Sequence, residues 1–491
     1  NVDFNGDLDV DGTSNLDVID VDGAANFAAD VTLANGADLI TASAGTSNVR
    51  FGVNAGNSIA SGGNYNTVVG DEAGTAITTG DNNVAVGFEA LKTLATSSQN
   101  TAVGHTALKL NTAANNSAFG YGALAANTTA SNNTALGRSS LEANTTGGSN
   151  VAVGRDALGA NTTASNNTAV GYNSLNANTT GTQNTALGAL ALDANTTGSY
   201  NTALGEKSLS TNILGAKSTA VGTFSLFNQN PASAVDMYNV AVGYDAGNAV
   251  TTGIQNTLIG GLAGDAITTA SYNTAVGTSA LSNTTTGINN TAVGRTSLFV
   301  NTTGTQNVAI GMDALQQNST GSQNTAVGRS ALITNTTADN NTALGYAALH
   351  ANTTGAQNTA VGQAAGDALT VGSYNIALGQ NALSSDTQGS QSVAIGSSAL
   401  FTQNFTSATA TNNTAVGHGA GAAVTTGTAC TLIGSLAGDS ITTGSFATYI
   451  GQEAGGATTT GTYNTFIGTG TIAGTGNFGA GSLVTTGSKN T

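Results

Sequence analysis

The sequence has few of the residues that most globular and most disordered proteins use. Charged residues make up 7% of the 491 residues, aromatic residues 5%, proline occurs once and tryptophan is missing. Few large apolar side chains leave little surface to bury in an ordinary core. Disordered chains, however, are rich in charge and proline. A strict repeat resolves this conflict, because each repeat can bury a small apolar face against the next.

Cysteine and basic residues are also scarce. Cys430 is the only cysteine, so a disulfide bond within the chain is excluded. It occupies a position where the repeat usually has Asn, which predicts a small buried side chain and not a reactive thiol. The net charge is −16, with 10 basic and 26 acidic residues. Such a chain has no basic stripe for a phosphate backbone, so we expect no nucleic-acid partner.

Long apolar runs are missing as well. Because no run reaches the roughly 18 residues that a transmembrane helix needs, we expect no membrane insertion. The chain starts without Met, carries no signal peptide, and ends inside a repeat motif at residues 488–491. We therefore expect it to be a piece of a longer chain.

A five-residue motif, Asn-Thr-Ala-Val-Gly, recurs from end to end. Its 24 glycines run from Gly70 to Gly468, and their spacing is 17 in all but three intervals, one of 16 and two of 21. This period is too short for two helices, and Asn-Thr-Thr-Gly in every repeat would break any helix. The spacing predicts an all-β protein, a parallel β-solenoid (β-roll) of about 24 coils, each with two short strands and two tight turns.

Positions within a coil are counted from the motif glycine, so that −2 lies two residues before it and +4 four residues after it. Thr(−3), Ala(−2) and Val(−1) are expected to form a strand, with Thr and Val on one face and Ala on the other. Val and a Leu at +4 are predicted to form a thin core, and the Ala-rich face to pair between chains. Asn(+7) and Gly(+10) are predicted to form the turns, since both tolerate left-handed backbone angles. Stacked Asn side chains are predicted to form amide ladders.

Two kinds of coil alternate along the chain. Sixteen coils have Leu at +4, and seven have Gly there; we call them Leu-type and Gly-type coils. Six of the seven Gly-type coils place Ile, Val or Leu at +7, as in Gly74 with Ile77. Since such a swap conserves volume, both side chains are expected to fill the same part of a packed interior.

The repeat divides the chain into three parts. Residues 1–50 are predicted to be an acidic neck or connector of strands and turns, 51–468 the solenoid shaft, and 469–491 a partial coil at a truncated end. Asp7, Asp9 and Asp11, followed by Gly12, resemble the first half of a calcium loop. The twelfth position of that loop should be an acidic residue but is Val18, so solvated carboxylates on a strand are the favoured interpretation and a calcium site the alternative.

The two 21-residue coils contain the candidate binding residues. We expect the extra residues to bulge from the shaft, where exposed aromatic side chains typically bind sugars or protein surfaces. The alternative interpretation is that these side chains pack around the insertion. The candidates are Phe227, Met237, Tyr238, Phe401 and Phe405.

No arrangement typical of catalysis or metal binding stands out from the repeat. The three histidines, at 105, 350 and 418, lack metal-ligand spacing. No Ser/His/Asp set or paired carboxylates are recognisable. We therefore expect no catalytic residue, no metal and no cofactor.

Two copies of the motif carry a family resemblance. Ser392-Val393-Ala394-Ile395-Gly396 and the segment 307–311 resemble the Ser-Val-Ala-Ile-Gly repeats of YadA-like heads in trimeric autotransporter adhesins. The resemblance covers roughly residues 51–468 and implies a left-handed parallel β-roll, three chains side by side, and surface attachment. The coils of that family are usually shorter than 17 residues. Similar arrays, led by segments like Gly6–Gly12, also occur in tail-fibre-like proteins of marine bacteriophages.

These features together predict a non-enzymatic, homotrimeric attachment fibre. The first expectation is an extracellular bacteriophage tail fibre on the virion surface that binds a host receptor, a glycan or an outer-membrane component. The first alternative is the head of a bacterial trimeric adhesin on the cell surface. An ice-binding solenoid is another alternative, although the insertions and the Leu/Gly alternation are expected to interrupt its threonine array. A polysaccharide-degrading fibre is the enzymatic alternative.

Overall fold

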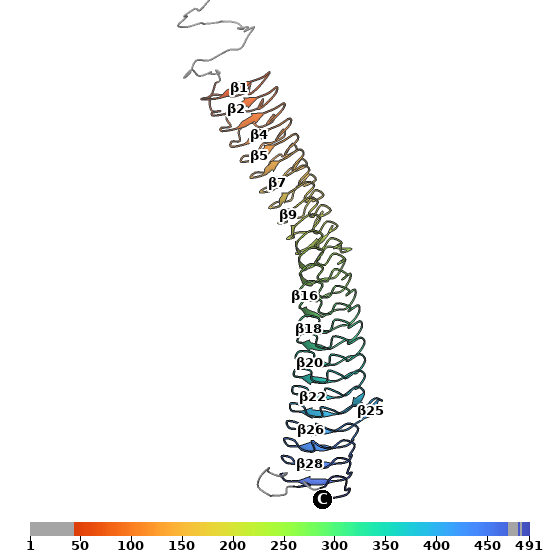
Figure 1. The fold of residues 1–491 in the computed structure, drawn as a ribbon. Helices are drawn as coiled ribbons and strands as arrows, with labels where there is room; N and C mark the ends of the chain where they lie inside the picture. The colour runs from red at the N-terminus through yellow and green to blue at the C-terminus, as the bar shows by residue number, and fades with distance from the viewer. Residues whose placement is uncertain (1–43, 470–479, 482–483) are drawn as a thin grey trace, which may run out of the picture. The chain divides into compact units, whose positions relative to one another are not determined.

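One short strand recurs in nearly every coil. The structure, a computed structural model, describes residues 44–469, 480–481 and 484–491. In this part of the chain 25 strands form a single parallel sheet, and they lie one above another along one side of the stacked coils (Figure 1). The all-β parallel solenoid with 17-residue spacing is thus confirmed.

The strands of the main sheet are three residues long. They are β1 (Val49–Phe51), β2 (Thr67–Val69), β3 (Val84–Val86), β4 (Thr101–Val103), β5 (Ser117–Phe119), β6 (Thr134–Leu136), β7 (Val151–Val153), β8 (Thr168–Val170), β9 (Thr185–Leu187), β10 (Thr202–Leu204), β12 (Thr219–Val221), β14 (Val240–Val242), β15 (Thr257–Ile259), β16 (Thr274–Val276), β17 (Thr291–Val293), β18 (Val308–Ile310), β19 (Thr325–Val327), β20 (Thr342–Leu344), β21 (Thr359–Val361), β22 (Ile376–Leu378), β24 (Val393–Ile395), β26 (Thr414–Val416), β27 (Thr431–Ile433), β28 (Thr448–Ile450) and β29 (Thr465–Ile467). Four two-residue strands form two further pairs: β11 (Gly215–Ala216) with β13 (Val235–Asp236), and β23 (Gly389–Ser390) with β25 (Thr409–Ala410).

The first strand belongs to a coil that the motif spacing did not include. Gly52 follows β1 as the motif glycines follow the later strands, and β1 pairs with β2 in parallel register. Residues 49 and 50 of the predicted neck are therefore part of the sheet. The rest of the neck up to residue 43, including Asp7, Asp9 and Asp11, lies outside the described residues. At the other end, residues 484–491 stack on the preceding coil, with the N–H of Thr465 donating to Asn490 O at 2.7 Å.

The strand points Ala(−2) toward the interior of the coil, whereas Val(−1) was expected there. Ala135 of β6 is fully buried, whereas Leu136 is 49% exposed, and the pattern recurs in the other coils. The prediction that Val(−1) forms the core and that Ala faces other chains is wrong. Because Leu(+4) fills much of the narrow interior of a Leu-type coil, only Ala fits opposite it at −2 in all sixteen of these coils.

The predicted second strand is also wrong, because positions +1 to +6 form a turn. Left-handed φ angles occur at 0, +2, +4 and −5, as at Leu141 (φ 50°) and Ser139 (φ 55°). Gly(+10) is needed for another reason, since a Cβ on Gly147 would lie 2.1 Å from Ala164 O. Hydrogen bonds between successive coils stabilise the turn: the N–H of Leu141 donates to Ala157 O at 3.0 Å.

The predicted amide ladders are confirmed, and there are two of them. At +7, Nδ2 of Asn144 donates to Oδ1 of Asn127 at 2.8 Å and to Gly147 O at 2.9 Å. At −4, the backbone N–H of Asn150 donates to Oδ1 of Asn133 at 2.9 Å. These bonds satisfy the side-chain amides that the coils bury.

The predicted exchange of volume between +4 and +7 is confirmed and extends to −2. A Cβ on Gly74 would lie 2.9 Å from Cδ1 of Ile77 and 3.2 Å from Cγ1 of Val68. Larger residues replace Ala(−2) beside other Gly-type coils too. These replacements, which the sequence displays but the prediction did not use, are Val68, Leu258, Leu432, Tyr449 and Phe466.

Candidate functional site

The two long coils have the same construction. Their extra residues follow position +7 and add the short strands β13 and β25 to the side away from the main sheet, where β25 is seen in Figure 1. The register of the main sheet continues across both insertions, since Thr219 pairs with Val240 and Val393 with Thr414. The insertions therefore change one side of the stack and leave the main sheet intact.

A buried glutamine forms hydrogen bonds inside each long coil. Gln229 lies at +7, and its Nε2 donates to Asn212 Oδ1 at 3.2 Å and to Ser218 Oγ at 3.0 Å. Gln403 similarly bridges Asp386 and Ser392. In both coils Ser replaces Asn at −4 and Gln replaces Asn at +7. The longer amide thus fills the space that the shorter serine leaves and links the two ladders.

The five candidate binding residues differ in their exposure to solvent. Met237 is fully buried and Phe405 is 7% exposed, so these two side chains pack inside the inserted loops and are not displayed. Tyr238 and Phe401 are exposed, at 47% and 39%. Phe227 is half-buried and packs edge-on against Phe224, with ring centroids 5.7 Å apart.

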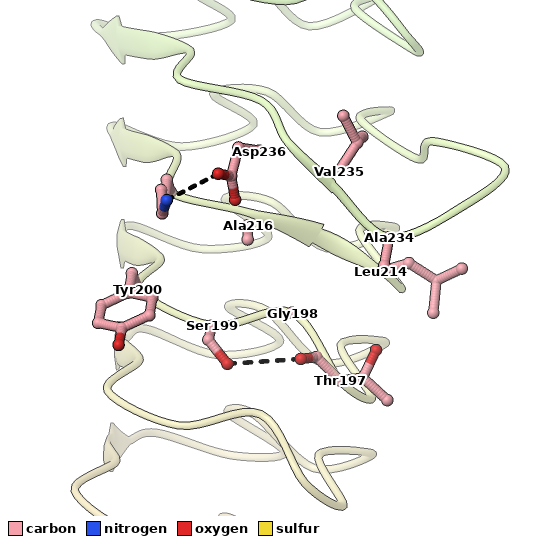
Figure 2. A pocket seen from close by; sticks show the side chains of 10 residues that line it. Thr197, Gly198, Ser199, Tyr200, Leu214, Ala216, Ala234, Val235 and Asp236 are labelled. Atoms are coloured by element: carbon pink, nitrogen blue, oxygen red, sulfur yellow. Dashed lines mark hydrogen bonds and ion pairs between the residues drawn. The ribbon is translucent and has the colours of Figure 1, made fainter.

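A shallow hollow of about 670 Å³ lies beside the first insertion (Figure 2). Its lining includes Tyr200, Lys217 and Asp236. Lys217 Nζ lies 2.7 Å from Asp236 Oδ2 and 5.2 Å from the ring centroid of Tyr238. The ion pair with Lys217 lowers the pKa of Asp236, and the same contact raises the pKa of Lys217. Both side chains are exposed to water, which weakens the pair.

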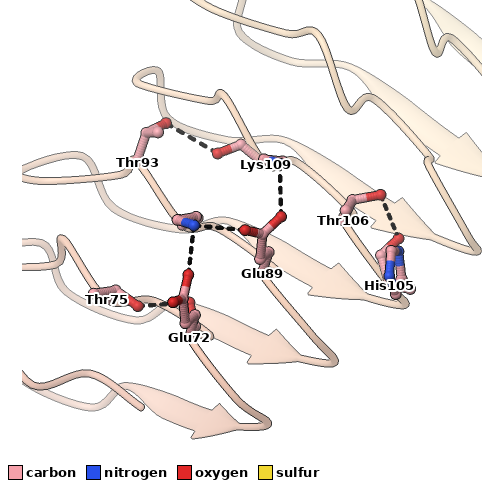
Figure 3. Close-up of polar contacts among 8 residues, drawn as sticks. Glu72, Thr75, Glu89, Thr93, His105, Thr106 and Lys109 are labelled. Atoms are coloured by element: carbon pink, nitrogen blue, oxygen red, sulfur yellow. Dashed lines mark hydrogen bonds and ion pairs between the residues drawn. The ribbon is translucent and has the colours of Figure 1, made fainter. Parts of the chain in front are cut away.

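Four alternating charges connect three coils near the start of the shaft (Figure 3). Lys92 lies between Glu72 and Glu89, at 2.5 Å from Glu89 Oε1, and Lys109 lies 2.6 Å from Glu89 Oε2. Hydrogen bonds from Lys109 and Lys92 lower the pKa of Glu89. Because each charge has an opposite neighbour, this cluster is a link between coils and not a free binding site.

The aromatic surface of the solenoid was missed by the sequence reasoning. Ten of the eleven tyrosines occupy only positions +1 and −5. Each of these ten is between 47% and 60% exposed. The signal was present in the spacing of the tyrosines, but it required counting each residue type by coil position. The +1 tyrosines are Tyr121, Tyr172, Tyr244 and Tyr346, and the −5 tyrosines are Tyr65, Tyr200, Tyr238, Tyr272, Tyr374 and Tyr463.

Among the described residues, the histidines and the cysteine are not part of a recognisable reactive centre. His105, His350 and His418 are all exposed. Cys430 is buried in the −4 ladder, and burial raises the pKa of its thiol. In the described ranges no three His, Cys, Asp or Glu side chains lie close enough together to hold a metal ion.

Two further findings concern membrane spans and similarity to known proteins. The described part of the chain contains no helix long and apolar enough to cross a membrane. No protein-family model, curated protein or solved structure matches this chain.

Proposed function

We propose that this chain is a non-enzymatic attachment fibre, first of all a bacteriophage tail fibre that binds a receptor on the host cell surface. The observation that carries the proposal is the placement of the tyrosines. Ten half-exposed rings occupy two fixed positions on a stack of coils whose backbone is hydrogen-bonded from coil to coil. Tyrosine has few rotatable bonds and offers both an apolar face and a hydroxyl, so it binds at little entropic cost.

The main sheet supports association between copies of this chain, for which a homotrimer is the proposed form. Its outer face presents an aliphatic side chain at −1 in nearly every coil, such as Leu136 (49% exposed), Leu187 (47%) and Leu344 (46%). A continuous apolar strip of this length needs a partner surface. Because every chain carries the same strip, other copies of the chain are the simplest partner.

The solution mass of the full chain tests this assembly. Light scattering after gel filtration should give three times 47.7 kDa. The double variant Leu187→Asp/Leu344→Asp should lower the mass to that of one chain while the β-sheet circular dichroism persists. A wild-type mass of 47.7 kDa would rule out the trimer.

The attachment itself is tested with labelled protein and bacterial cells. Saturable binding that is lost after surface polysaccharide or surface protein is removed would support an attachment role. Failure to bind any cell type, with a folded trimer in hand, would count against it. A bacterial adhesin head differs from a phage fibre in its gene, which should continue into a coiled-coil stalk and a membrane anchor.

One observation favours ice binding as a second candidate. Positions −3 and −1 point outward, and their backbone register continues across both insertions; 17 of the 24 motif coils have Thr at −3. The threonine array itself is interrupted, because Val240 and Val393 stand at −3 in the two coils whose motifs border the insertions. Thermal hysteresis tests this function directly: an ice-binding monomer should show hysteresis that Thr→Lys substitutions on this face abolish. A trimer that buries the face should show none.

A further inference from the structure

Position +1 holds most of the arginines and histidines of the chain, in addition to four tyrosines. Four of the five arginines and two of the three histidines lie there. In six consecutive coils this position holds only aromatic or cationic side chains, all of them exposed. We call this set the +1 stripe; it consists of Phe88, His105, Tyr121, Arg138, Arg155 and Tyr172.

The rings of the stripe lie against one another from coil to coil. The ring centroids of Phe88 and His105 are 5.1 Å apart, and those of His105 and Tyr121 are 5.0 Å apart with an interplanar angle of 12°. Arg155 lies 5.7 Å from the ring centroid of Tyr172. Stacked neighbours restrict each side chain, so the stripe is ordered before it meets a ligand.

Its two arginines are available to an anion. Arg138 forms no ion pair within the described residues, and Arg155 pairs only with its neighbour Asp156, at 2.9 Å and with 57% of its own side chain exposed. The two lysines of the nearby cluster form ion pairs, Lys92 with Glu72 and Lys109 with Glu89. His105 lies apart from these carboxylates (Figure 3). Two adjacent, weakly compensated cations stand out on a chain of net charge −16.

We propose that the +1 stripe binds an extended acidic polysaccharide, with sugar carboxylates on Arg138 and Arg155 and sugar hydroxyls on the hydroxyl groups of Tyr121 and Tyr172. This inference rests on the proposed attachment function and names the class of its receptor. A planar guanidinium matches a carboxylate with two parallel hydrogen bonds. Because neighbouring side chains cover faces of the Tyr121 and Tyr172 rings, the contact offered to a sugar is the exposed hydroxyl, which can exchange hydrogen bonds with sugar hydroxyls.

The spacing of the stripe fits a chain of sugars. Stacked coils advance by about 4.8 Å, which is close to the length of one sugar ring within a polysaccharide. Successive sugars can therefore contact successive coils, and affinity should grow with chain length. Nucleic acid fits poorly, because two arginines neutralise few phosphates and the rest of the surface repels the backbone.

Isothermal titration of the full chain with hexagalacturonate tests the proposal, with a neutral glucose hexamer and single-stranded DNA as comparison probes. Hexagalacturonate should bind, and more tightly at low salt because salt screens the ion pairs. Arg138→Ala/Arg155→Ala should weaken binding about tenfold or more, since charge-assisted hydrogen bonds are lost. Arg138→Lys/Arg155→Lys should restore part of the loss, and Tyr121→Ala/Tyr172→Ala should weaken binding of both carbohydrate chains.

Lys92→Ala/Lys109→Ala is the charge-matched control, because it removes two positive charges at position +5 of the coils that carry Phe88 and His105, away from the two arginines. It should leave the affinity for hexagalacturonate unchanged. Equal losses in both double variants, equal affinity for galacturonate monomer and hexamer, tighter binding of DNA, or no binding at all would each overturn the proposal. If the chain binds cells but not acidic oligosaccharides, this inference fails and the attachment function stands. If it binds acidic oligosaccharides but no cells, the attachment function fails and the stripe remains a polysaccharide-binding site.

Discussion

Leu-type and Gly-type coils follow the same backbone path with different interiors. Position +4 has a φ of 50° at Leu141 and 60° at Gly438, so both residue types adopt the left-handed conformation. Glycine takes this conformation without strain, whereas leucine does so at a cost. Coil-to-coil hydrogen bonds and the burial of the leucine side chain must offset that cost, which shows that stacking sets the backbone and the side chains adapt to it.

The interiors differ in how they combine polar and apolar groups. Most Leu-type coils bury one leucine and continue the +7 amide ladder, although one buries Leu94 at +7 in addition to Leu91. Most Gly-type coils bury an aliphatic residue at +7 and interrupt the ladder. At one such junction the ladder ends at Asn352, because the next coil has Leu369, and Oδ1 of Asn352 is buried without a hydrogen-bond partner. The three half-buried aspartates with raised pKa values, Asp265, Asp367 and Asp439, all directly follow the glycine of a Gly-type coil.

Removing the core leucine of a Leu-type coil should have the largest effect. Leu141→Ala is expected to destabilise its coil by about 4 kcal/mol, since it leaves a cavity in a single-leucine core. Leu141→Gly should cost about 1 kcal/mol less than Ala, because glycine relieves the left-handed strain. Hydrogen exchange of the amides at 134–150 measures both values; an alanine variant more stable than the glycine variant would contradict the role of strain.

Adding a leucine to a Gly-type coil should be nearly as harmful. A Cβ on Gly438 would lie 2.8 Å from Leu432 Cδ2 and 2.9 Å from Ile441 Cδ1. Gly438→Leu is therefore expected to cost about 3 kcal/mol through overpacking. Adding Leu432→Ala, Ile441→Asn and Tyr449→Ala converts the surroundings to the Leu type and should recover most of the loss in thermal unfolding. No recovery would mean that the two interiors are not interchangeable.

The amide ladder gives a smaller effect that depends on location. Asn144→Leu should cost about 2 kcal/mol, because Oδ1 of Asn127 loses its donor and Nδ2 of Asn161 loses an acceptor, whereas the carbonyl of Gly147 keeps the Nδ2 of Asn133. Asn352→Leu is the matched substitution at the end of a ladder, where Oδ1 already lacks a partner. It should cost clearly less than Asn144→Leu in the same hydrogen-exchange experiment, and equal costs would exclude an effect of ladder continuity.

The smallest expected effect is a pH dependence of a Gly-type coil. Burial raises the pKa of Asp439 above 3.8, and the nearby negative charge of Glu453, at position +2 of the next coil, adds to the shift. The folded state then binds more protons than the unfolded state, so this carboxylate destabilises the fold above its folded pKa, and the penalty disappears as the pH falls to 3.8. Asp439→Asn should therefore raise the melting temperature slightly at about pH 7 and not at about pH 3.5. An equal gain at both pH values would point to packing and not to charge.

The candidate site was predictable only in part. The two long coils were visible as breaks in the spacing, but the burial of Met237 and Phe405 depends on how the inserted loops fold back onto the preceding coils. The compensation of Ser218 by Gln229 has no local signal, since these residues meet only after the coils close. The +1 stripe was present in the spacing, and its exposure follows once the direction of each side chain in the coil is known.

The sequence by itself determined the period, the parallel β-solenoid, the amide ladders and the exchange between Leu(+4) and the aliphatic residue at +7. A 17-residue repeat must place equal residues above one another, and stacked Asn side chains or volume-conserving swaps follow from that alignment. Only the tertiary structure decided which strand face points inward and where the left-handed residues lie. Alternation predicts two faces without saying which one is inside, and the interior settles this because Leu(+4) leaves room only for Ala at −2; Val and larger residues occur at −2 only in coils without Leu(+4).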